Sequence, residues 1–412
     1  MSNKPIIVVI GGGAAGFFGA ITCAENNPHC QVILLEKVRQ LLAKVRISGG
    51  GRCNVTHSCF EPAQLINSYP RGGKELRGPF SRFQPRDTIA WFEARGVKLK
   101  VENDGRMFPI TDSSETIISC LLGQAKTFGV EIRTEIGVID CMRDHNKFTL
   151  TLSNGDHLSC DRLLVATGGT SKTSVWLEKL GHTIMAPVPS LFTFNIPNSP
   201  LNALSGISVP HAKVILTESG LHQSGPLLIT HWGFSGPAIL KLSAWGARLL
   251  HEKKYKTQVK INWLPDHNEE KLKELLLSFQ KTHAARLVSN ESPVILPKNL
   301  WKALLEMATV PADLRWAMFS KLHLRNLMQM LQHCEFQIDG KSTNKDEFVT
   351  CGGIKLSEVN FKTMESLICP GLYFAGEVLD IDGVTGGFNF QNAWTTGWLA
   401  GHAIGQINEL SG

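Results

Sequence analysis

Three glycines near the start of the chain, Gly11, Gly13 and Gly16, have the GxGxxG spacing of a turn that holds a dinucleotide pyrophosphate. They follow Ile6–Ile10, a β-branched run typical of a buried parallel strand, and they open an apolar stretch of small residues that includes Ala15. Glycine permits the tight turn and the close approach of phosphate, and the N-terminus of a helix supplies unpaired N–H groups. The spacing therefore predicts a strand–turn–helix unit that binds a pyrophosphate.

An acidic residue stands where the next predicted strand ends. The run Gln31–Leu35 is hydrophobic enough for a second buried strand, and Glu36 and Lys37 follow it directly. A carboxylate at this point accepts hydrogen bonds from ribose hydroxyls and repels a 2′-phosphate, which favours FAD or NAD over NADP. A glycine-rich turn without a ligand is the alternative, and the strand before the glycines and the acid after them argue against it.

Three later segments favour FAD. The stretch Lys44–Asn54 carries three consecutive glycines, which suit a backbone nest for phosphate and ribityl oxygens, although a mobile surface loop is the alternative. The hydrophobic run Leu163–Gly169 ends in ATGG. Near the C-terminus, the strand Gly371–Glu377 ends in an acid, and Gly386–Gly387 opens a helix whose N-terminus can face a flavin ring. Because the chain returns to the nucleotide-binding domain so late, we expect its middle to be an insertion.

Five motifs together resemble a known family: SGGGRCNVT, GRMFP, ATGG, LLITHWGFSGPAIL and LYFAGEVLDIDGVTGGFNFQNAWTTG. They look like those of the bacterial FAD flavoproteins that include aminoacetone oxidase and 3-dehydro-bile-acid reductase, and the resemblance covers essentially the whole chain. It implies an α/β fold with a Rossmann-like FAD-binding domain, related to that of glutathione reductase, interrupted by an inserted domain of a β-barrel plus helices.

The sequence shows no signature of a covalent flavin linkage, so we expect non-covalent FAD, with NAD(P)H as a candidate electron donor. The resemblance also implies which residues contact the cofactor. Carried over by position, these are Gly11, Gly13, Ala15, Gly16, Glu36, Lys37, Lys44, Ser48, Gly50, Gly51, Arg52, Cys53, Asn54, Val138, Ala166, Thr167, Gly168, Gly376, Glu377, Gly387, Phe388, Asn389 and Phe390. The sequence departs from the family after ATGG, where it runs directly into Thr170–Trp176 and lacks several residues. This departure affects the substrate more than the fold.

The pattern of hydrophobic and turn-forming residues changes in the middle of the chain. We expect residues 1–190 and 348–412 to form the FAD-binding domain and 191–347 the inserted domain. Four strand-like runs predict an antiparallel sheet or barrel, at 191–196, 212–216, 227–230 and 257–263. A helical section of about 266–333 follows, with expected helices at 268–282, 298–307 and 311–333. The last of these carries a stripe that we expect in the core, made of Leu322, Leu324, Leu327, Met328 and Leu331.

The loop Thr230–Pro237 is unusually rich in residues that could contact a substrate. His231 and Trp232 either form an active-site wall or belong to a tight turn that packs Trp232 into the core, and the sequence leaves both interpretations open. Together with Arg52 they are the candidates for a catalytic role, which is otherwise unassigned.

An FAD-dependent oxidoreductase that acts on a small organic substrate is the leading interpretation. The flavin exchanges hydride, and the protein supplies position and electrostatics, so that no protein nucleophile is required. Two reactions fit: oxidation of an amine with oxygen as acceptor, and reduction of an enone-type carbon–carbon double bond with a nicotinamide donor. The residues after ATGG contain no second GxGxxG motif for a nicotinamide domain.

Two alternatives remain. A dithiol–flavin reductase would use Cys53 and Cys59, but their CxxxxxC spacing is one residue longer than usual, which matters because disulfide geometry is strict. An RNA-modification flavoprotein or a flavin-binding regulatory protein would need a basic face. The most basic stretches, Arg71–Arg86 and Lys253–Lys260, are short and interrupted.

The composition excludes several classes of protein. The 412 residues are 43% hydrophobic and 19% charged with a formal charge of +6, which excludes a disordered or disulfide-dense chain. Without a run of like charges, we expect neither a nucleic-acid nor a membrane partner. The uncharged stretch 5–24 imitates a membrane span, but its glycines break such a helix. Ten cysteines without a CxxC motif predict free thiols, no metal and a cytoplasmic location; the oligomeric state is not readable.

Overall fold

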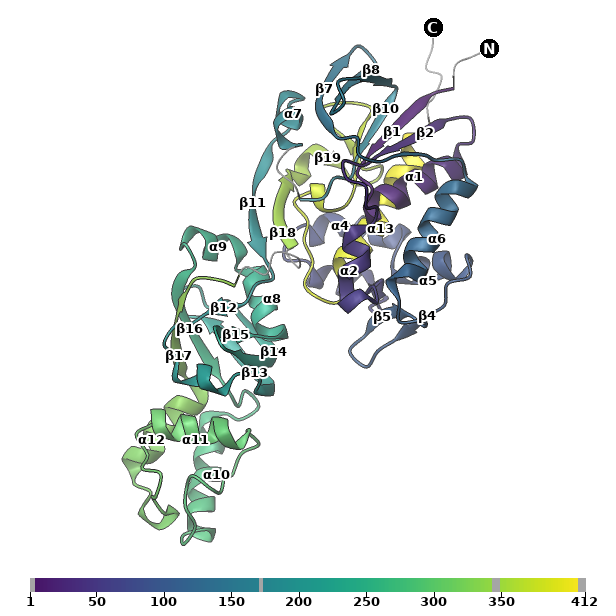
Figure 1. The fold of residues 1–412 in the computed structure, drawn as a ribbon. Helices are drawn as coiled ribbons and strands as arrows, with labels where there is room; N and C mark the ends of the chain where they lie inside the picture. Colours follow the sequence, from purple (N-terminus) through teal and green to yellow (C-terminus); the bar gives the residue numbers. More distant parts are fainter. Residues whose placement is uncertain (1–3, 170–172, 343–348, 407–412) are drawn as a thin grey trace. The chain divides into compact units, whose positions relative to one another are not determined.

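The computed structural model describes residues 4–169, 173–342 and 349–406. The chain divides into two units, the first made of Met1–Val188 and Val349–Gly412 and the second of Pro189–Phe348 (Figure 1). We describe each unit by itself. Within the described ranges, none of the helices combines the length and the apolar character needed to cross a membrane.

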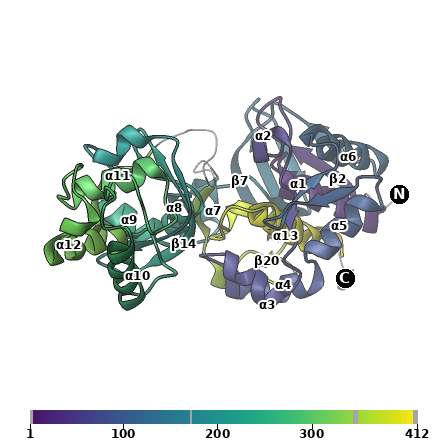
Figure 2. The ribbon, with the colours of Figure 1, turned by 90° about the horizontal axis from the view of Figure 1, so that it is seen from below.

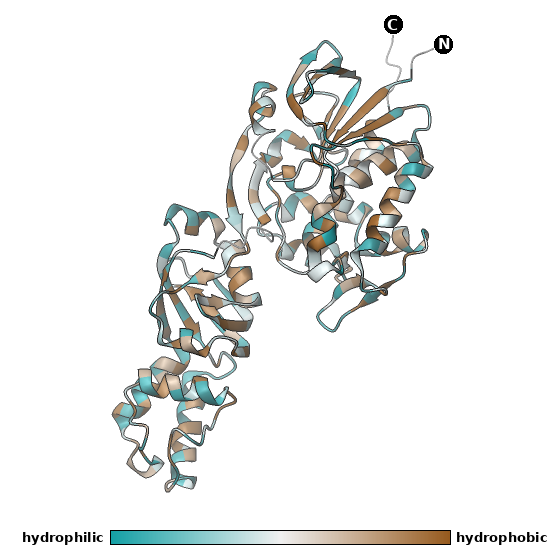
Figure 3. Ribbon diagram, viewed as in Figure 1, coloured by the Kyte–Doolittle hydropathy of each residue, from teal (hydrophilic) through white to brown (hydrophobic). Residues whose placement is uncertain are grey.

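A seven-stranded sheet forms the centre of the first unit, in the order β19-β20-β21-β10-β1-β2-β6. The five strands from β21 to β6 are parallel, and β19 and β20 add an antiparallel edge. The central strands are hydrophobic and buried along nearly their whole length (Figure 3), as parallel strands covered on both faces must be. The strands are β1 (Ile6–Ile10), β2 (Gln31–Leu35), β6 (Glu131–Arg133), β10 (Arg162–Val165), β19 (Val359–Asn360), β20 (Glu365–Ser366) and β21 (Leu372–Phe374).

Two helices, α1 (Ala14–Asn26) and α13 (Phe388–Ile404), lie side by side in both ribbon views (Figures 1 and 2). Their backbones touch at glycines. A Cβ atom on Gly397 would lie 2.7 Å from the carbonyl oxygen of Ala15, and one on Gly401 would lie 2.6 Å from that of Gly19. Only glycine allows this approach, and the order of the contacts shows that the two helices run parallel.

The two helices do not begin level with each other. Gly397 lies nine residues after the first residue of α13. It packs beside Ala15 and Gly19, which lie one and five residues after the first residue of α1, or about three on average. The N-terminus of α13 therefore extends about six residues, or about 9 Å at 1.5 Å per residue, beyond that of α1. Both N-termini face the edge where the parallel strands end, because each helix follows such a strand.

Smaller elements surround this frame. They comprise helices α2 (Ala43–Gly51), α3 (Pro62–Leu65), α4 (Gly73–Arg82), α5 (Pro85–Glu93), α6 (Ser114–Thr127) and α7 (Ser174–Lys179), the 3-10 turns η1 (Ile66–Ser68), η4 (Leu356–Glu358) and η5 (Gly376–Val378), a sheet of β3 (Thr56–His57), β4 (Leu99–Val101) and β5 (Arg106–Pro109), a sheet of β7 (Val138–Asp144), β8 (Lys147–Leu152) and β9 (His157–Cys160), and the pair β11 (Ile184–Ser190) and β18 (Val349–Ile354).

The second unit has an antiparallel sheet in the order β12-β15-β14-β13-β16-β17. A bridge between Phe194 on β12 and Lys341, just beyond β17, links the two edge strands. Its elements are β12 (Phe194–Asn195), η2 (Pro200–Leu204), β13 (Ser208–Leu216), β14 (His222–Thr230), β15 (Gly233–Ser235), α8 (Pro237–Trp245), α9 (Ala247–Glu252), β16 (Lys256–Asn262), α10 (Glu269–Thr282), α11 (Lys298–Met307), η3 (Trp316–Met318), α12 (Lys321–Gln332) and β17 (Cys334–Asp339).

The expected helix over 311–333 is wrong in its first half. The helix α12 begins only at Lys321, where the Ser320 side chain caps it by accepting a hydrogen bond from the backbone of His323. The residues before it are held by another segment instead, since the N–H of Trp316 donates to the carbonyl of Arg286. The expected core stripe also loses one member, because Leu322 is 61% exposed whereas the other four residues are buried.

A buried histidine ties the segment after α7 to the sheet edge. The Nδ1 atom of His182 lies 3.0 Å from a carboxylate oxygen of Glu358, and its Nε2 atom lies 2.9 Å from the hydroxyl of Ser366. The Ser366 hydroxyl also accepts from the N–H groups of Ile368 and Cys369, so its own proton is directed at the imidazole. Burial lowers the pKa of His182 below its ordinary 6.5, although Glu358 opposes this shift.

The stability of the protein is expected to fall as the pH drops below about 6.5, because His182 binds a proton more readily in the unfolded chain than in the folded protein. The Glu358 carboxyl, whose pKa is lowered by its hydrogen bonds to Thr183 and His182 despite burial, adds a further loss at lower pH. We predict that His182→Gln reduces the change in melting temperature between pH 7.5 and pH 5.5. An equal pH dependence in both proteins would show that His182 titrates normally.

The glycine contact between α1 and α13 predicts a large effect of one methyl group. Gly401→Ala places Cβ against the backbone of Gly19, and we expect a loss of about 1–3 kcal/mol in the free energy of unfolding. Gly123→Ala on the exposed face of α6 is the control, because no described atom lies within 4 Å of its Cβ position. That control should gain up to about 1 kcal/mol. Urea denaturation measures both, and equal stabilities would contradict the close contact.

Candidate functional site

The glycine turn between β1 and α1 forms a cradle. A Cβ on Gly11 would lie 2.4 Å from the carbonyl oxygen of Ala166, and one on Gly16 would lie 1.9 Å from that of Gly11, so both positions require glycine for packing. Gly13 differs, because no described atom lies within 4 Å of its Cβ position. Within the described chain no side chain caps α1, so its first N–H groups are directed to an open space that suits an anion.

Glu36 braces this turn from the end of β2. Its carboxylate accepts hydrogen bonds from the N–H of Gly12 at 2.7 Å and from that of Val38 at 3.1 Å. The carbonyl of Glu36 accepts from Ile136, two residues before Val138. A Cβ on Gly137 would lie 3.4 Å from that of Lys37. The structure thus brings Glu36, Lys37 and Val138 to one corner of the sheet.

The ends of β10 and β21 lie next to the same turn. Ala166, Thr167 and Gly168 follow β10, and Gly376 and Glu377 follow β21. A Cβ on Gly376 would lie 2.9 Å from that of Ala15, and one on Gly168 would lie 3.8 Å from a carboxylate oxygen of Glu377.

Glu377 is held by a lysine from a distant part of the chain. The Nζ atom of Lys44 lies 2.6 Å from a carboxylate oxygen of Glu377, whose side chain is only 16% exposed. Lys44 itself belongs to α2, which leads into the glycine loop. The ion pair therefore connects the end of β21 to that loop.

The glycine loop after Ile47 is left-handed. Gly49, Gly50 and Gly51 have φ angles of +59°, +69° and +83°, and no described atom lies within 4 Å of the Cβ positions of Gly50 and Gly51. Ser48 interrupts the α-helical geometry with a ψ of 147°. The segment is therefore an open, specifically shaped backbone turn that side chains other than glycine would strain.

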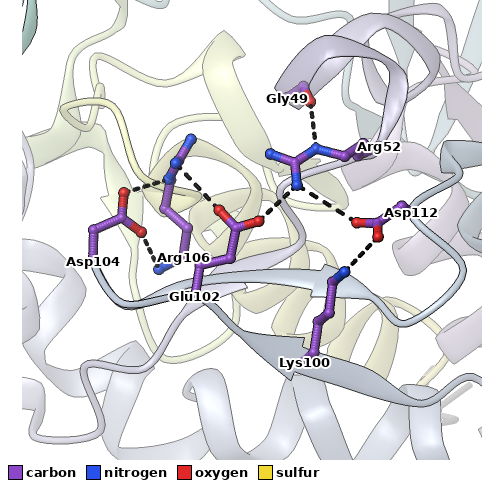
Figure 4. Close-up of polar contacts among 7 residues, drawn as sticks. All are labelled: Gly49, Arg52, Lys100, Glu102, Asp104, Arg106 and Asp112. Carbon is purple, nitrogen blue, oxygen red and sulfur yellow. Dashed lines mark hydrogen bonds and ion pairs between the residues drawn. The ribbon is translucent and has the colours of Figure 1, made fainter.

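Arg52 supports the loop from within. Its guanidinium donates to a carboxylate oxygen of Glu102 at 2.6 Å and to the carbonyl of Gly49 at 3.4 Å (Figure 4). It also lies 4.0 Å from the ring centre of Phe108. The hydrogen bond to Glu102 raises the pKa of Arg52 further above its usual range. A carboxylate oxygen of Asp112 lies 3.5 Å from the same Nη atom that contacts Glu102. Arg52, a catalytic candidate by sequence, is thus committed to these carboxylates and to the loop.

The N-terminus of α13 is joined to the glycine loop through Asn54. With its amide oriented to satisfy both ends, the Asn54 side chain accepts from the N–H of Gly387 at 2.9 Å and donates to the carbonyl of Thr56 at 3.0 Å. Gly387, with a φ of 93°, caps the helix. The Asn389 side chain makes two hydrogen bonds to the backbone of Gly383, at 2.8 and 2.9 Å, so it holds the preceding turn.

The aromatic residues at this terminus have their own partners. Phe388 stacks on His57 with ring centres 4.7 Å apart, and its carbonyl accepts from the hydroxyl of Tyr69 at 2.7 Å. Phe390 stacks on Trp394 at 5.7 Å. His57 and Tyr69 are not recognisable from the sequence, because neither belongs to a periodic or glycine-marked pattern.

The surroundings of Cys53 and Cys59 do not activate their thiols. All ten cysteines lie in described parts of the chain, and none of them forms a disulfide bond. Cys53 is fully buried and burial raises its pKa to about 12, and burial also raises the pKa of Cys59. A reactive thiol needs a lowered pKa, so this geometry does not favour a dithiol reductase. The described residues hold no group of three or more His, Cys, Asp or Glu side chains that suits a metal.

His231 and Trp232 lie in the second unit, in the turn between β14 and β15. Trp232 is 68% exposed, so the interpretation in which it packs into the core is wrong. The carbonyl of Trp232 accepts from the N–H of Ile196 at 2.7 Å, and the hydroxyl of Thr230 donates to the carbonyl of Gly233 at 3.1 Å. The turn is therefore fixed while its indole ring is presented to solvent.

Comparison with known proteins decides the family, because the model of the HI0933-like protein Rossmann domain matches residues 5–403. The chain belongs to this family. It is 31% identical to the ribosomal RNA dihydrouridine synthase of Escherichia coli strain K12, over 95% of this chain and 96% of that protein. It is 26% identical to the 3-dehydro-bile acid delta(4,6)-reductase of Clostridium scindens, over 97% and 99% of the two chains.

A solved structure shows the same fold at low identity. The 3-ketosteroid delta1-dehydrogenase from Sterolibacterium denitrificans matches with a TM-score of 0.52 at 10% identity, over 98% of this chain and all of that one. Membership of the family makes the protein an FAD-dependent oxidoreductase with a Rossmann-like FAD-binding domain, as the sequence predicted.

The geometry of the strand ends fits FAD. The open cradle at Gly13 suits the pyrophosphate, and a second helix N-terminus lies about 9 Å further along the helix axis. That offset matches a cofactor in which a ribityl chain separates a pyrophosphate from a flavin ring. Between the two termini lie the open glycines of the loop and the shielded Glu377 carboxylate.

Glu36 is expected to matter for the affinity of FAD. Removal of a charged acceptor, which is worth about 1.5–3 kcal/mol, should weaken FAD binding in Glu36→Ala about tenfold to a hundredfold. Glu131→Ala is the control, because that exposed carboxylate on neighbouring β6 pairs with Gln31 at the far end of β2. Titration of the apoprotein with FAD measures both affinities. Wild-type affinity in Glu36→Ala would place Glu36 away from the ribose.

Proposed function

We propose that this protein is an FAD-dependent reductase that saturates a carbon–carbon double bond conjugated to a carbonyl group, and that its substrate is a uridine in ribosomal RNA. The observation that carries the proposal is the match, along essentially the whole chain, to a relative named for dihydrouridine synthesis. The second relative, named as a delta(4,6)-reductase of a 3-dehydro bile acid, supports the same chemistry. In uridine and in a 3-dehydro-delta(4,6) bile acid alike, the double bond that becomes saturated is conjugated to a carbonyl group.

We assign the cofactor contacts to residues of the first unit. The N–H groups at the start of α1 bind the pyrophosphate, Glu36 accepts from the ribose, and Glu377 accepts from the ribityl chain. The start of α13, at Phe388 and Asn389, faces the pyrimidine edge of the ring. When bound and reduced by two electrons, the flavin would supply a hydride to one carbon of the double bond, and a proton would complete the other carbon.

The contribution of the chain is positioning. Lys44 orients the Glu377 carboxylate, and Arg52 fixes the glycine loop through Glu102. A nicotinamide donor is our proposal for the source of the hydride, since reduction of a double bond consumes two electrons in each cycle. Exchange at a flavin does not require an activated thiol or a hydroxyl nucleophile, which agrees with the raised pKa of Cys53.

From the lack of a run of like charges and from the interrupted basic stretches, we expected no nucleic-acid partner. An RNA substrate replaces that expectation. The stretch Arg71–Arg86 folds into α4 and α5, where Lys74, Arg77 and Arg86 are exposed. Such cations suit contacts to phosphates, whose strength falls steeply with salt concentration. RNA reduction by this protein should therefore weaken as the salt concentration rises.

The test is reduction of ribosomal RNA by the purified holoenzyme. We expect unmodified ribosomal RNA with NADPH or NADH to gain two hydrogens on one uridine, detected by mass spectrometry of RNA fragments. A 3-oxo-Δ4 steroid and a panel of amines are tested in parallel. Reoxidation of reduced flavin by the steroid and not by RNA would overturn the RNA substrate. Reduction of the flavin by an amine, with no turnover of either unsaturated compound, would overturn the reductase itself.

A further inference from the structure

An ion pair is buried where the chain turns into α13. The guanidinium of Arg71 makes a two-pronged contact with the carboxylate of Asp382, through Nε to Oδ1 and through an Nη to Oδ2. The side chain of Asp382 is completely buried and that of Arg71 is 12% exposed. Burial of two charges costs stability that pairing regains only in part, so such a pair is poor evidence of a purely stabilising role.

The two residues join two segments that are far apart in sequence. Arg71 and Asp382 also form a backbone bridge, and the N–H of Val384 donates to the carbonyl of Ser68 at 2.8 Å. A Cβ on Gly72 would lie 2.4 Å from a side-chain carbon of Ile381. We call residues 68–72 and 381–384 together the clamp. The ion pair is at its centre.

The clamp makes hydrogen bonds to the first turn of α13. The Tyr69 hydroxyl in the clamp donates to the carbonyl of Phe388, the first residue of the helix. Asn389 holds Gly383 by two hydrogen bonds. This turn lies beyond the reach of the close glycine contacts with α1, which begin only at Gly397. The clamp therefore holds the N-terminus of α13 together with Asn54, which accepts from the N–H of Gly387.

We propose that Arg71 and Asp382 are positioning residues that hold the N-terminus of α13 against the pyrimidine edge of the flavin and thereby raise its reduction potential. The inference rests on the placement of FAD in the proposed function. Reduced flavin carries negative charge on that edge, and the positive end of a helix stabilises a nearby anion. The two charges of the pair cancel, so its effect acts through the position of the helix.

The test uses Arg71→Gln/Asp382→Asn, which removes both charges of the pair together. We expect the equilibrium between oxidised and reduced flavin to shift about tenfold toward the oxidised form, a fall of about 30 mV for a two-electron couple. We also expect weaker binding of FAD. Spectroelectrochemical titration of the holoenzyme measures the potential, and no substrate is present.

A matched control is Arg95→Gln/Glu25→Gln. In this pair one Nη of Arg95 contacts both carboxylate oxygens of Glu25, at 2.9 and 3.0 Å, and the pair lies at the C-terminal end of α1. Its loss should leave the flavin potential unchanged. If the neutral double variant does not fold or retain FAD, Arg71→Lys keeps the charge but removes the two-pronged contact, and its potential should also fall.

A potential equal to that of the wild type in the FAD-loaded double variant or in Arg71→Lys would overturn the inference. So would an equal fall in the control, which would indicate general loosening of the unit. Because the measurement uses no RNA, its failure is distinguishable from that of the proposed function. A wild-type enzyme that does not reduce RNA leaves the potential measurement intact.

Discussion

The direct contact between the backbones of α1 and α13 is the constraint on which the site depends. Gly397 and Gly401 allow the two helices to approach until carbonyl oxygens of α1 touch α13. Because the helices are parallel and follow strands of one sheet, their positive ends reach the same edge at different heights. Two anion-stabilising positions about 9 Å apart along the axis follow from this packing, before any side chain is considered.

Charged side chains connect the segments that surround these two helices. Lys44 pairs with Glu377, Arg52 with Glu102 and Arg71 with Asp382. Each pair joins a segment before residue 72 to a distant strand end or turn. Cations that are paired in this way orient carboxylates and loops, and we propose that N–H groups and helix dipoles stabilise the negative charge of the pyrophosphate. Such groups are fixed before the ligand binds, so little reorganisation accompanies binding.

The sequence predicted the parts of the site that depend on local pattern. The glycines at 11, 13 and 16 and the acid at 36 are recognisable because strand, turn and helix follow one another within thirty residues. The roles of Arg52 and Asn389 were not predictable, since their partners Glu102 and Gly383 are chosen by the fold. Tyr69 and Arg71 were missed altogether, because their contacts lie 319 and 311 residues away in the sequence.

We expect the residues that we assign to the cofactor to be distinct from those that select the substrate. Every residue that we assign to FAD belongs to the first unit, where glycine contacts and ion pairs leave little freedom. Relatives named for an RNA product and for a bile acid both match across both units, so a missing or added domain does not explain their different substrates. We expect the difference to lie in side chains or in loops, such as the segment after ATGG where this chain lacks several residues. The side chain of Trp232 does not set the shape of its turn, because its carbonyl accepts from the N–H of Ile196 while its ring is exposed. A turn held by its backbone can change such a side chain without a change of fold.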